Sequence, residues 1–366
     1  MRLLIVGNIA NTGLYLTSKL REKGISADLY MEKNPYRASD PKSVGKLDGE
    51  YPDWIKFYDT RKNWKRNLVS TMRKYDLISA ATELPIFAQF SLKPFVAVAT
   101  GSDLHLLAHS KSFKGVLLRM GYKRAKVLVY NLPTHLESVK KLKLKNAVFL
   151  PLFKEFEALD ANEISNRKIK DKFVFFHPTS QRWEIKKNHL FLKAFVRLTK
   201  SYDNVFLILI NHGEDADKAI DFLSNAGIDD KFKILPGTLI QKEMLEQYHS
   251  CDAVVDQFGV GAFGFIGLEV LNIGKPFVCY IRKNVYETLY GEVPPVLSSN
   301  NEDGIYNILQ DLVEKKELCK KLSFNSQKWM QKFHSPDSLI TKYIKLYEMV
   351  YDGKKIDEIS EAIKFY

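Results

Sequence analysis

The residues best suited to chemistry lie in the run DQFGVGAFGFIGLE, which spans Asp256 to Glu269. The apolar segment Ala253–Val255 before this run predicts a strand, and the apolar residues after it predict a helix that ends at Gly274. Glycines let a ligand approach the backbone closely, and the N-terminus of a helix favours an anion. This stretch therefore predicts a binding site for an anionic ligand, with the carboxylate of Glu269 nearby.

A second candidate group follows the strand predicted at Phe173–His177. Arg182 and Lys186 lie on the turn into an amphipathic helix, where two cations can neutralise the charge of a departing diphosphate. Thr179 and Ser180 precede them and are either phosphate-binding hydroxyls or helix caps. The alternative for the two cations is that they are solvated charges at the start of a helix.

The first half of the chain offers candidates after two predicted strands. In the segment TGSDLH (100–105), Asp103 could accept a proton from a hydroxyl group and His105 could hydrogen-bond a sugar. Alternatively, Ser102 and Asp103 cap the helix that follows. Gly13 lies in the loop after the first strand and either allows close approach of a ligand or belongs to a plain turn. This loop lacks the Gly-x-Gly-x-x-Gly spacing of dinucleotide-binding folds.

The order of strand, glycine loop, carboxylate-bearing helix and Gly-x-Pro stop resembles the nucleotide-sugar site of the retaining GT-B glycosyltransferases (glycosyl transferases group 1, family-4-like). Residues 262–264 take the place of that family's Gly-Phe-Gly, Glu269 matches its second glutamate, and Gly274-Lys275-Pro276 matches its closing stop. The first glutamate of the family's Glu-x7-Glu motif falls on Gly261 and is absent here. The run Phe-His-Ser-Pro at 333–336 also resembles the family.

The resemblance implies how the candidate residues are used. Glu269 would hold the ribose hydroxyls, Lys186 and Arg182 the diphosphate, and the TGSDLH segment would lie where sugar and acceptor meet. Apart from the resemblance, Asp256 and Gln257 end the strand at the glycine loop, and either could contact the donor sugar and partly substitute for the missing glutamate. The implied catalytic residues are Asp103, His105, Arg182 and Lys186, and the implied nucleotide-sugar contacts are Gly13, Thr179, Asp256, Gly261, Phe263, Gly264, Phe265 and Glu269. The family also implies retention of anomeric configuration, no required metal and no cofactor.

Strand and helix signals alternate along the whole chain, which predicts parallel α/β layers. We expect a Rossmann-like domain at 1–150, a linker at 151–171, a second Rossmann-like domain at 172–335, and helices at 336–366 that cross back to the first domain. Residues 33–60 are rich in Pro, Asp, Ser, Tyr and Lys, which predicts a long loop. With the resemblance, the predicted fold is GT-B, in which two parallel-sheet domains face an interdomain cleft.

Composition narrows the class of protein. At 366 residues, with 45% hydrophobic and 27% charged residues, the chain has the size and balance of a two-domain globular protein. Its longest apolar runs are of strand length, and the start MRLLIVGN is typical of a buried strand, so we expect neither a membrane span nor a signal peptide. Three cysteines without metal-binding spacing favour a reducing cytoplasm.

The net charge of +12 is concentrated in the first half of the chain. Residues 1–150 contain 26 Lys and Arg against 12 Asp and Glu, whereas residues 151–366 contain 29 against 31. The family takes its acceptor on the first domain, so this surplus predicts an anionic acceptor or an anionic surface. The segment 111–126 mixes cations with apolar side chains such as Phe113 and Met120, which suits a helix on a lipid headgroup layer. Alternatively, its apolar face is core and its lysines are solvated.

We therefore predict a cytoplasmic glycosyltransferase whose partners are a nucleotide sugar and a glycan or lipid-linked acceptor, with an anionic membrane surface at the inner face as a further partner to test. A second hypothesis is a non-catalytic nucleotide-sugar-binding scaffold on the same fold, because Gly261 replaces the glutamate. A third hypothesis, nucleic-acid binding by the basic half, lacks a recognised module, and no nucleic-acid partner is expected.

Overall fold

The chain divides into two compact units. The computed structural model describes residues 1–35, 39–44, 50–61, 63–156, 169–237 and 239–365. The first unit contains Met1–Glu155 together with Phe333–Tyr366, and the second contains Phe156–Lys332. Most of the linker predicted at 151–171 lies outside the described residues.

The first unit is built on a seven-stranded parallel sheet with the strand order β3-β2-β1-β4-β5-β6-β7. Alternate residues of a central strand point to opposite faces, and both faces are buried, as expected for a parallel sheet covered by helices. The strands are β1 (Arg2–Val6), β2 (Ser26–Glu32), β3 (Ile55–Tyr58), β4 (Leu77–Ala81), β5 (Phe95–Ala99), β6 (Val127–Tyr130) and β7 (Ala147–Phe149).

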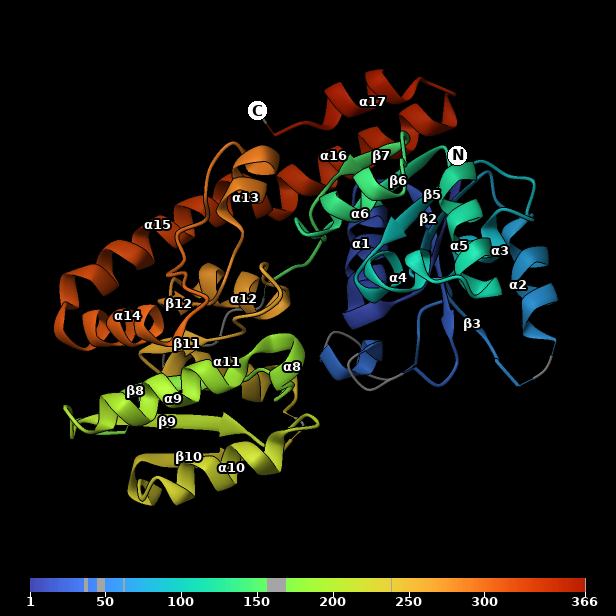
Figure 1. The fold of residues 1–366 in the computed structure, drawn as a ribbon. Helices are drawn as coiled ribbons and strands as arrows, with labels where there is room; N and C mark the ends of the chain where they lie inside the picture. The colour runs from blue at the N-terminus through green and yellow to red at the C-terminus, as the bar shows by residue number, and fades with distance from the viewer. Residues whose placement is uncertain (36–38, 45–49, 62, 157–168, 238, 366) are drawn as a thin grey trace. The chain divides into compact units, whose positions relative to one another are not determined.

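Helices cover both faces of this sheet (Figure 1). Helices α1 and α16 lie on one face, and α2, α3 and α5 lie on the other. The α-helices of this unit are α1 (Thr12–Glu22), α2 (Trp64–Met72), α3 (Pro85–Ala88), α4 (Ser102–His105), α5 (Phe113–Arg124), α6 (His135–Lys141), α16 (Pro336–Tyr351) and α17 (Ile356–Ile363). Short 3-10 turns occur at Ile9–Asn11, Pro41–Val44 and Leu107–His109.

The C-terminal helices belong to the first unit, as predicted. The Tyr343 hydroxyl of α16 donates a hydrogen bond to the Pro151 carbonyl at 2.9 Å, and the Tyr347 hydroxyl lies 3.0 Å from the Ser79 hydroxyl on β4. Both tyrosines are buried in the same apolar cluster as the residues of α1 that face the sheet. The last part of the chain therefore completes the core that its first part begins.

The prediction of a continuous loop at 33–60 is wrong at its end. Residues 55–58 form β3, which pairs in parallel with β2 from Leu29↔Ile55 to Glu32↔Tyr58. The strand is short and lies at the edge of the sheet, with only Ile55 fully buried, so its apolar pattern is weak. Residues 36–38 and 45–49 of the predicted loop lie outside the described residues.

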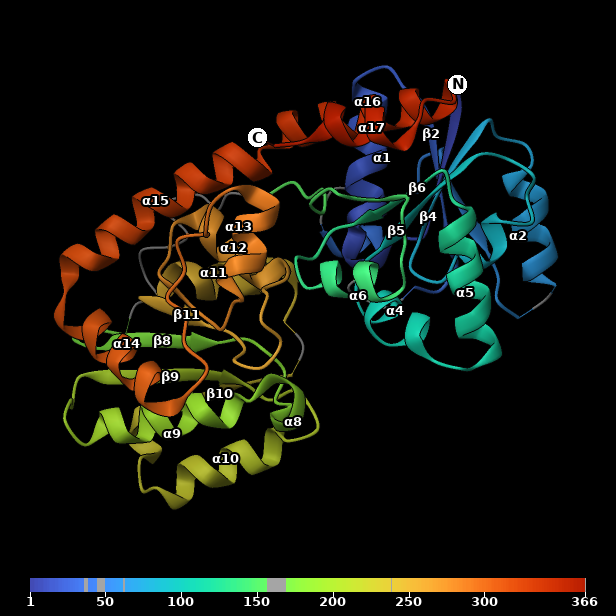
Figure 2. The ribbon, with the colours of Figure 1, turned by 45° about the horizontal axis from the view of Figure 1, so that its top comes forward.

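The second unit is a five-stranded parallel sheet with the order β10-β9-β8-β11-β12. Helices α9 and α14 pack side by side against it, which Figure 2 shows. The strands are β8 (Phe173–His177), β9 (Val205–Ile210), β10 (Phe232–Leu235), β11 (Ala253–Val255) and β12 (Phe277–Val278). The helices are α8 (Trp183–Lys186), α9 (Asn188–Thr199), α10 (Ala216–Asn225), α11 (Gln241–Ser250), α12 (Phe265–Ile273), α13 (Lys283–Tyr290), α14 (Glu302–Glu314) and α15 (Lys316–His334), with a 3-10 turn at Asp229–Lys231.

Each sheet has one point at which the strand order reverses direction. In the first unit the point lies between β1 and β4, and in the second it lies between β8 and β11. In open α/β sheets, ligands bind beyond the carboxyl ends of the strands at such a point. The residues that follow β1, β4, β8 and β11 are therefore the ones to inspect.

Candidate functional site

A polar cluster lies at the reversal point of the second sheet. Thr179 and Ser180 follow β8, Asp256 follows β11, and Lys186 ends α8. The Lys186 ammonium donates hydrogen bonds to the Thr179 hydroxyl at 2.9 Å and to the Ser180 hydroxyl at 2.8 Å. Thr179 in turn hydrogen-bonds Asp256, whose side chain is buried. The structure thus brings together three residues predicted for the site: Lys186, Thr179 and Asp256.

Burial shifts both charged members of this cluster. Burial raises the pKa of the Asp256 carboxyl, and the nearby Lys186 charge and the Thr179 hydrogen bond oppose that shift. Burial lowers the pKa of the Lys186 ammonium, the Asp256 charge opposes the shift, and the Arg182 charge adds to it. The Lys186 cation is therefore poorly solvated, and an anionic ligand beside it would restore favourable interactions.

A buried histidine fixes the two strands that carry this cluster. His177 Nδ1 lies 2.8 Å from the Val255 carbonyl oxygen, and its Nε2 lies 3.1 Å from the Asn188 side-chain nitrogen. Burial lowers the pKa of His177 to about 4, so the ring is neutral at pH 7. A carbonyl only accepts, so Nδ1 carries the proton and Nε2 accepts from Asn188. His177 therefore has a structural role beneath the site.

Arg182 is held apart from the cluster by a partner of its own. Its guanidinium forms an ion pair with Glu214, with Nη2 2.6 Å and Nε 3.2 Å from the same carboxylate oxygen. Both side chains are well exposed, at 45% for Arg182 and 73% for Glu214. An exposed pair of this kind contributes little stability, so a phosphate could compete for the guanidinium. The sequence placed Arg182 and Lys186 on one turn, and it gave no sign of Glu214.

The glycine loop after β11 is held by the amide of Gln257. Its oxygen accepts from the backbone N–H groups of Gly259 at 2.9 Å and Val260 at 2.6 Å. Its nitrogen donates to the carbonyls of Ala262 at 2.7 Å and Tyr280 at 3.2 Å. These four bonds use the full capacity of the amide. The sequence offered Gln257 as a sugar-binding alternative to Asp256, whereas its hydrogen bonds go to the loop and to the Tyr280 carbonyl.

Gly261 has a backbone conformation that excludes a glutamate. Its φ is +82°, and a Cβ built on it would lie 2.8 Å from Arg282 Nε and 3.0 Å from Arg282 Cγ. The Arg282 backbone N–H also donates to the Gly261 carbonyl at 2.9 Å. The loop is therefore shaped around a glycine with an arginine against it, and a glutamate at this position would be strained.

The predicted contacts at 263–265 divide between core and surface. Phe263 is buried and stacks on Tyr286, with ring centroids 5.4 Å apart, so it is a packing residue. Gly264 is exposed at the N-terminus of α12, with nothing within 4 Å of a Cβ built there, and Phe265 is half-buried. Gly264 therefore leaves space above the first turn of the helix, a position at which helices can bind an anion.

Glu269 lies in the second turn of α12 and is half-buried. Glu269 lies close to Tyr248 of α11. Burial raises the pKa of the Tyr248 phenol, and the negative charge of Glu269 raises that pKa further. The carboxylate is thus partly open to solvent on the same helix whose N-terminus faces the glycine loop. This placement is compatible with the ribose contact that the resemblance implies.

In the first unit, Asp103 holds the loop after β5. Its carboxylate accepts from the backbone N–H groups of Thr100 at 3.2 Å and Gly101 at 2.6 Å, and from the Tyr122 hydroxyl at 2.8 Å. It is only 6% exposed. These contacts give Asp103 a structural role in the loop before α4, and they argue against a role as proton acceptor. Among the described residues, no side-chain hydrogen bond caps α4, so the predicted alternative of a helix cap is not what Asp103 provides.

His105 lies two residues beyond Asp103, at the end of α4, and is half-buried. Its Nε2 lies 2.9 Å from the Thr134 hydroxyl, and its ring packs edge-on against His135 with centroids 4.6 Å apart. Burial lowers the pKa of His135 to about 3, and the neighbouring His105 lowers it further. The structure therefore joins His105 to the residues after β6.

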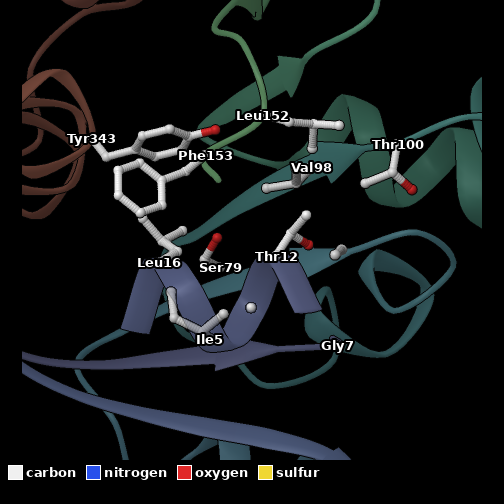
Figure 3. Close-up of a pocket in the computed structure, with 12 residues that line it drawn as sticks. Ile5, Gly7, Thr12, Leu16, Ser79, Val98, Thr100, Leu152, Phe153 and Tyr343 are labelled. Atoms are coloured by element: carbon white, nitrogen blue, oxygen red, sulfur yellow. The ribbon is translucent and has the colours of Figure 1, made fainter. Parts of the chain in front are cut away.

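Gly13 is required for packing at the start of α1. A Cβ at this position would lie 2.3 Å from the Gly7 carbonyl oxygen and 2.9 Å from a methyl group of Leu29. Gly13 and Thr12 also line a cavity of about 30 Å³, which Figure 3 shows between α1 and β5. That volume suits a water molecule or two and is too small for a sugar.

Among the residues that the structure describes, no group of three or more His, Cys, Asp or Glu side chains is arranged to hold a metal ion. Within the same residues, no helix is both long and apolar enough to cross a membrane.

The chain resembles known proteins in sequence over its second unit and in fold over nearly its whole length. Residues 159–329 match the family model described as glycosyl transferases group 1, and no curated protein sequence matches the chain. The solved structures that share the fold include the following three. HepE from Anabaena, in complex with UDP-glucose, has a TM-score of 0.73 and 14% identity over 94% of this chain and 98% of its own.

The second is a glycosyltransferase from Rickettsia africae, with a TM-score of 0.69 and 10% identity over 95% of this chain and 98% of its own. The third is a mutant of TarM from S. aureus in complex with Fondaparinux, α-GlcNAc-glycerol and UDP. Its TM-score is 0.66 at 10% identity, over 95% of this chain and all of its own. With its two parallel sheets and its C-terminal helices in the first unit, the chain has the GT-B fold, as predicted.

Proposed function

We propose that this protein, a glycosyltransferase of the glycosyl transferases group 1, moves a sugar from a nucleoside diphosphate to a hydroxyl group of a glycan or lipid-linked acceptor. The observation that carries the proposal is the Lys186 ammonium at the β8–β11 reversal point, bonded to two hydroxyls and next to the glycine loop. HepE and TarM are recorded with UDP-glucose and UDP, so uridine diphosphate sugars are the first compounds to test.

Lys186 would act on the leaving group. When the bond between the anomeric carbon and the phosphate oxygen breaks, its electron pair remains on the diphosphate, and a nearby ammonium stabilises the added charge. The new bond joins the anomeric carbon to the acceptor oxygen, whose proton leaves with the diphosphate. Backbone N–H groups at the start of α12 would add to the anion site, and Glu269 would hold the ribose.

Retention of configuration and independence from a metal or cofactor are part of this proposal. The positive charge that the diphosphate needs would come from Lys186 and, after release from Glu214, from Arg182. We expect Asp103 to position the loop near the acceptor and not to remove the proton, since its carboxylate already accepts three hydrogen bonds.

A direct test is the release of nucleoside diphosphate from a panel of nucleotide sugars, measured with wild-type protein and Lys186→Ala. We expect wild-type protein to release nucleoside diphosphate from one sugar, slowly with water and faster with an acceptor extract. Tight binding of nucleotide sugars without any release in the presence of acceptors would favour the non-catalytic scaffold instead.

We also propose that the acceptor is presented at an anionic membrane surface. On α5, Leu118 and Tyr122 face the core, whereas Phe113 is 78% exposed and Val116 and Met120 are each 38% exposed. These three exposed residues recur at helical spacing, and Lys123 and Arg124 follow them at the end of the same helix. An exposed apolar stripe beside cations suits adsorption to anionic lipid headgroups.

The membrane proposal is tested by sedimentation with vesicles of phosphatidylglycerol and phosphatidylcholine. Phe113→Ser should weaken binding several-fold, while Phe324→Ser, which removes a 69% exposed phenylalanine from α15 in the second unit, should leave it unchanged. No binding of wild-type protein, or equal loss in both variants, would count against this surface.

A further inference from the structure

A second, larger cavity lies at the carboxyl ends of β1, β2, β3 and β4, around the reversal point of the first sheet. Its volume is about 350 Å³, within the range of small-molecule sites. It lies wholly within the first unit. The residues that line it are Gly7, Asn8, Ile9, Met31, Glu32, Pro35, Ser39, Tyr58, Thr60, Trp64, Thr82, Glu83, Leu84 and Phe87.

One side of this cavity is a continuous aromatic wall. Tyr58 stacks on Trp64 with centroids 5.8 Å apart and planes 17° apart, and Phe87 meets Trp64 edge-on at 5.1 Å. Tyr30 supports Tyr58 from β2, with centroids 5.3 Å apart. Because these rings pack directly on one another, they form a single aromatic wall.

The polar groups of the cavity include two carboxylates. Glu32 accepts a hydrogen bond from the Thr60 hydroxyl at 3.1 Å, and Glu83 forms an ion pair with Lys114 of α5. A carboxylate has about four lone-pair sites, so each retains acceptor capacity for ligand hydroxyls. Burial raises the pKa of Tyr58 to about 12, helped by the Glu32 charge, so its hydroxyl stays protonated at neutral pH.

The charge of the lining is the opposite of the charge of its surroundings. Residues 1–150 contain 26 Lys and Arg, yet none of the described lining residues is Lys or Arg. Glu83 is already paired with Lys114, so an anionic ring in this cavity would be repelled mainly by the Glu32 carboxylate, which is unfavourable at low dielectric. A ring that is apolar on its faces and carries hydroxyls on its edges meets both the aromatic wall and the carboxylate acceptors.

We propose that this cavity is a subsite for an uncharged sugar ring, held between the Tyr58–Trp64–Phe87 wall and the Glu32 and Glu83 carboxylates. Its assignment as the acceptor subsite rests on the proposed function, but the sugar-binding site itself does not. The surplus cations of the first unit, including those on α5, then bind a different part of the acceptor or the membrane and not the sugar ring held in this cavity.

The experiment is saturation-transfer NMR on the full chain without nucleotide. The probes are glucose and N-acetylglucosamine as neutral sugars, glucuronate as an anionic sugar, and tetramethylammonium as a cation. The variants are Trp64→Ala and the isosteric Glu32→Gln, with the exposed carboxylate variant Glu50→Gln as control. The melting temperature and circular dichroism of every variant are measured without ligand to show that the first unit is folded. Thermal stabilisation by nucleoside diphosphate is measured as well, because it reports on the second unit.

We expect saturation transfer to at least one neutral sugar, little to glucuronate, and an affinity about tenfold weaker in Trp64→Ala and Glu32→Gln but unchanged in Glu50→Gln. The inference is overturned if neutral sugars do not bind, if glucuronate or tetramethylammonium binds instead, or if both cavity variants bind like wild type. A normal nucleotide response alongside such a result would leave the proposed transferase function standing.

Discussion

The two sheets place opposite chemistry at equivalent positions. Beyond β8 and β11, the second sheet presents a half-buried lysine bonded to two hydroxyls and a glycine loop that leads into a helix N-terminus. Beyond β1 and β4, the first sheet presents an aromatic wall and two carboxylates. The topology that positions the two edges is the same, so the ligand class at each is decided by the few residues that follow the strands.

This difference also separates net charge from local charge. The first half of the chain holds the entire positive surplus, yet its cavity is lined with Glu32 and Glu83. The second half is close to neutral, yet it contains the lysine suited to an anion. Net charge therefore describes what the surface of a unit attracts, and it does not identify what its binding site holds.

The largest expected effect is on turnover at the site beyond β8 and β11, where the diphosphate is expected to bind. Lys186→Ala should lower nucleotide-sugar turnover by about 10²–10³-fold, because it removes the charge that stabilises the departing diphosphate. Steady-state release of nucleoside diphosphate measures this. Lys193→Ala, which removes an exposed charge from the neighbouring α9, is the matched control and should behave like wild type. Equal activity of Lys186→Ala and Lys193→Ala would contradict the assignment of an anion site to the second sheet, and with it the contrast between the two sheets.

Replacing glycine by alanine in the glycine loop should destabilise the protein at one position and have a smaller effect at another. Gly261→Ala should lower the free energy of unfolding by about 1–3 kcal/mol, because its φ of +82° and the nearby Arg282 both oppose a side chain. Gly264→Ala should cost less, since a Cβ there meets nothing within 4 Å. Urea denaturation compares the two, and Gly261→Glu, which restores the family's glutamate, should destabilise at least as much as Gly261→Ala.

The pH dependence of nucleotide binding should reflect the lowered pKa of Lys186. The pKa of Lys186 is lowered by burial, so the ammonium loses its proton, and binding weakens, at a lower pH than the ordinary lysine value of 10.5 would give. The Asp256 charge raises this pKa, so Asp256→Asn should move the alkaline loss to still lower pH. Calorimetric titration with nucleoside diphosphate from neutral to alkaline pH checks both, and a shift to higher pH would contradict the assignment.

The smallest expected effect concerns Arg182. Since its guanidinium is exposed and paired with Glu214, Arg182→Ala should weaken nucleotide affinity only about two- to fivefold, an effect typical of a solvated charge. Glu214→Ala should instead strengthen affinity slightly, because it releases the guanidinium. A loss in Arg182→Ala as large as that in Lys186→Ala would mean that the two cations act together in the bound state.

Much of the fold could be predicted from the sequence, because the apolar runs and the turn residues that bound them indicate the same strands and helices. The strands predicted at Phe173–His177 and Ala253–Val255 match the structure residue for residue. Each is a strongly apolar segment. The edge strand β3 was missed, because its four residues are only partly buried and their pattern is weak.

The candidate site was only partly accessible, because contacts between distant segments leave little trace in local sequence. Lys186 and Thr179 are seven residues apart and were predicted to lie together. The pairing of Arg182 with Glu214, 32 residues away, could not be anticipated, and neither could the contact of Gly261 with Arg282. The aromatic wall was missed for the same reason, since it joins side chains from β3, α2 and α3.

The measurement that tests the account most directly is a thermal-shift panel of nucleoside diphosphates and nucleotide sugars on wild type, Lys186→Ala and Glu269→Ala. The account predicts that one nucleotide raises the melting temperature of wild-type protein and that both variants lose most of that stabilisation. If no nucleotide stabilises the wild-type protein, or if both variants respond as wild type does, the nucleotide-sugar site is not at the β8–β11 edge.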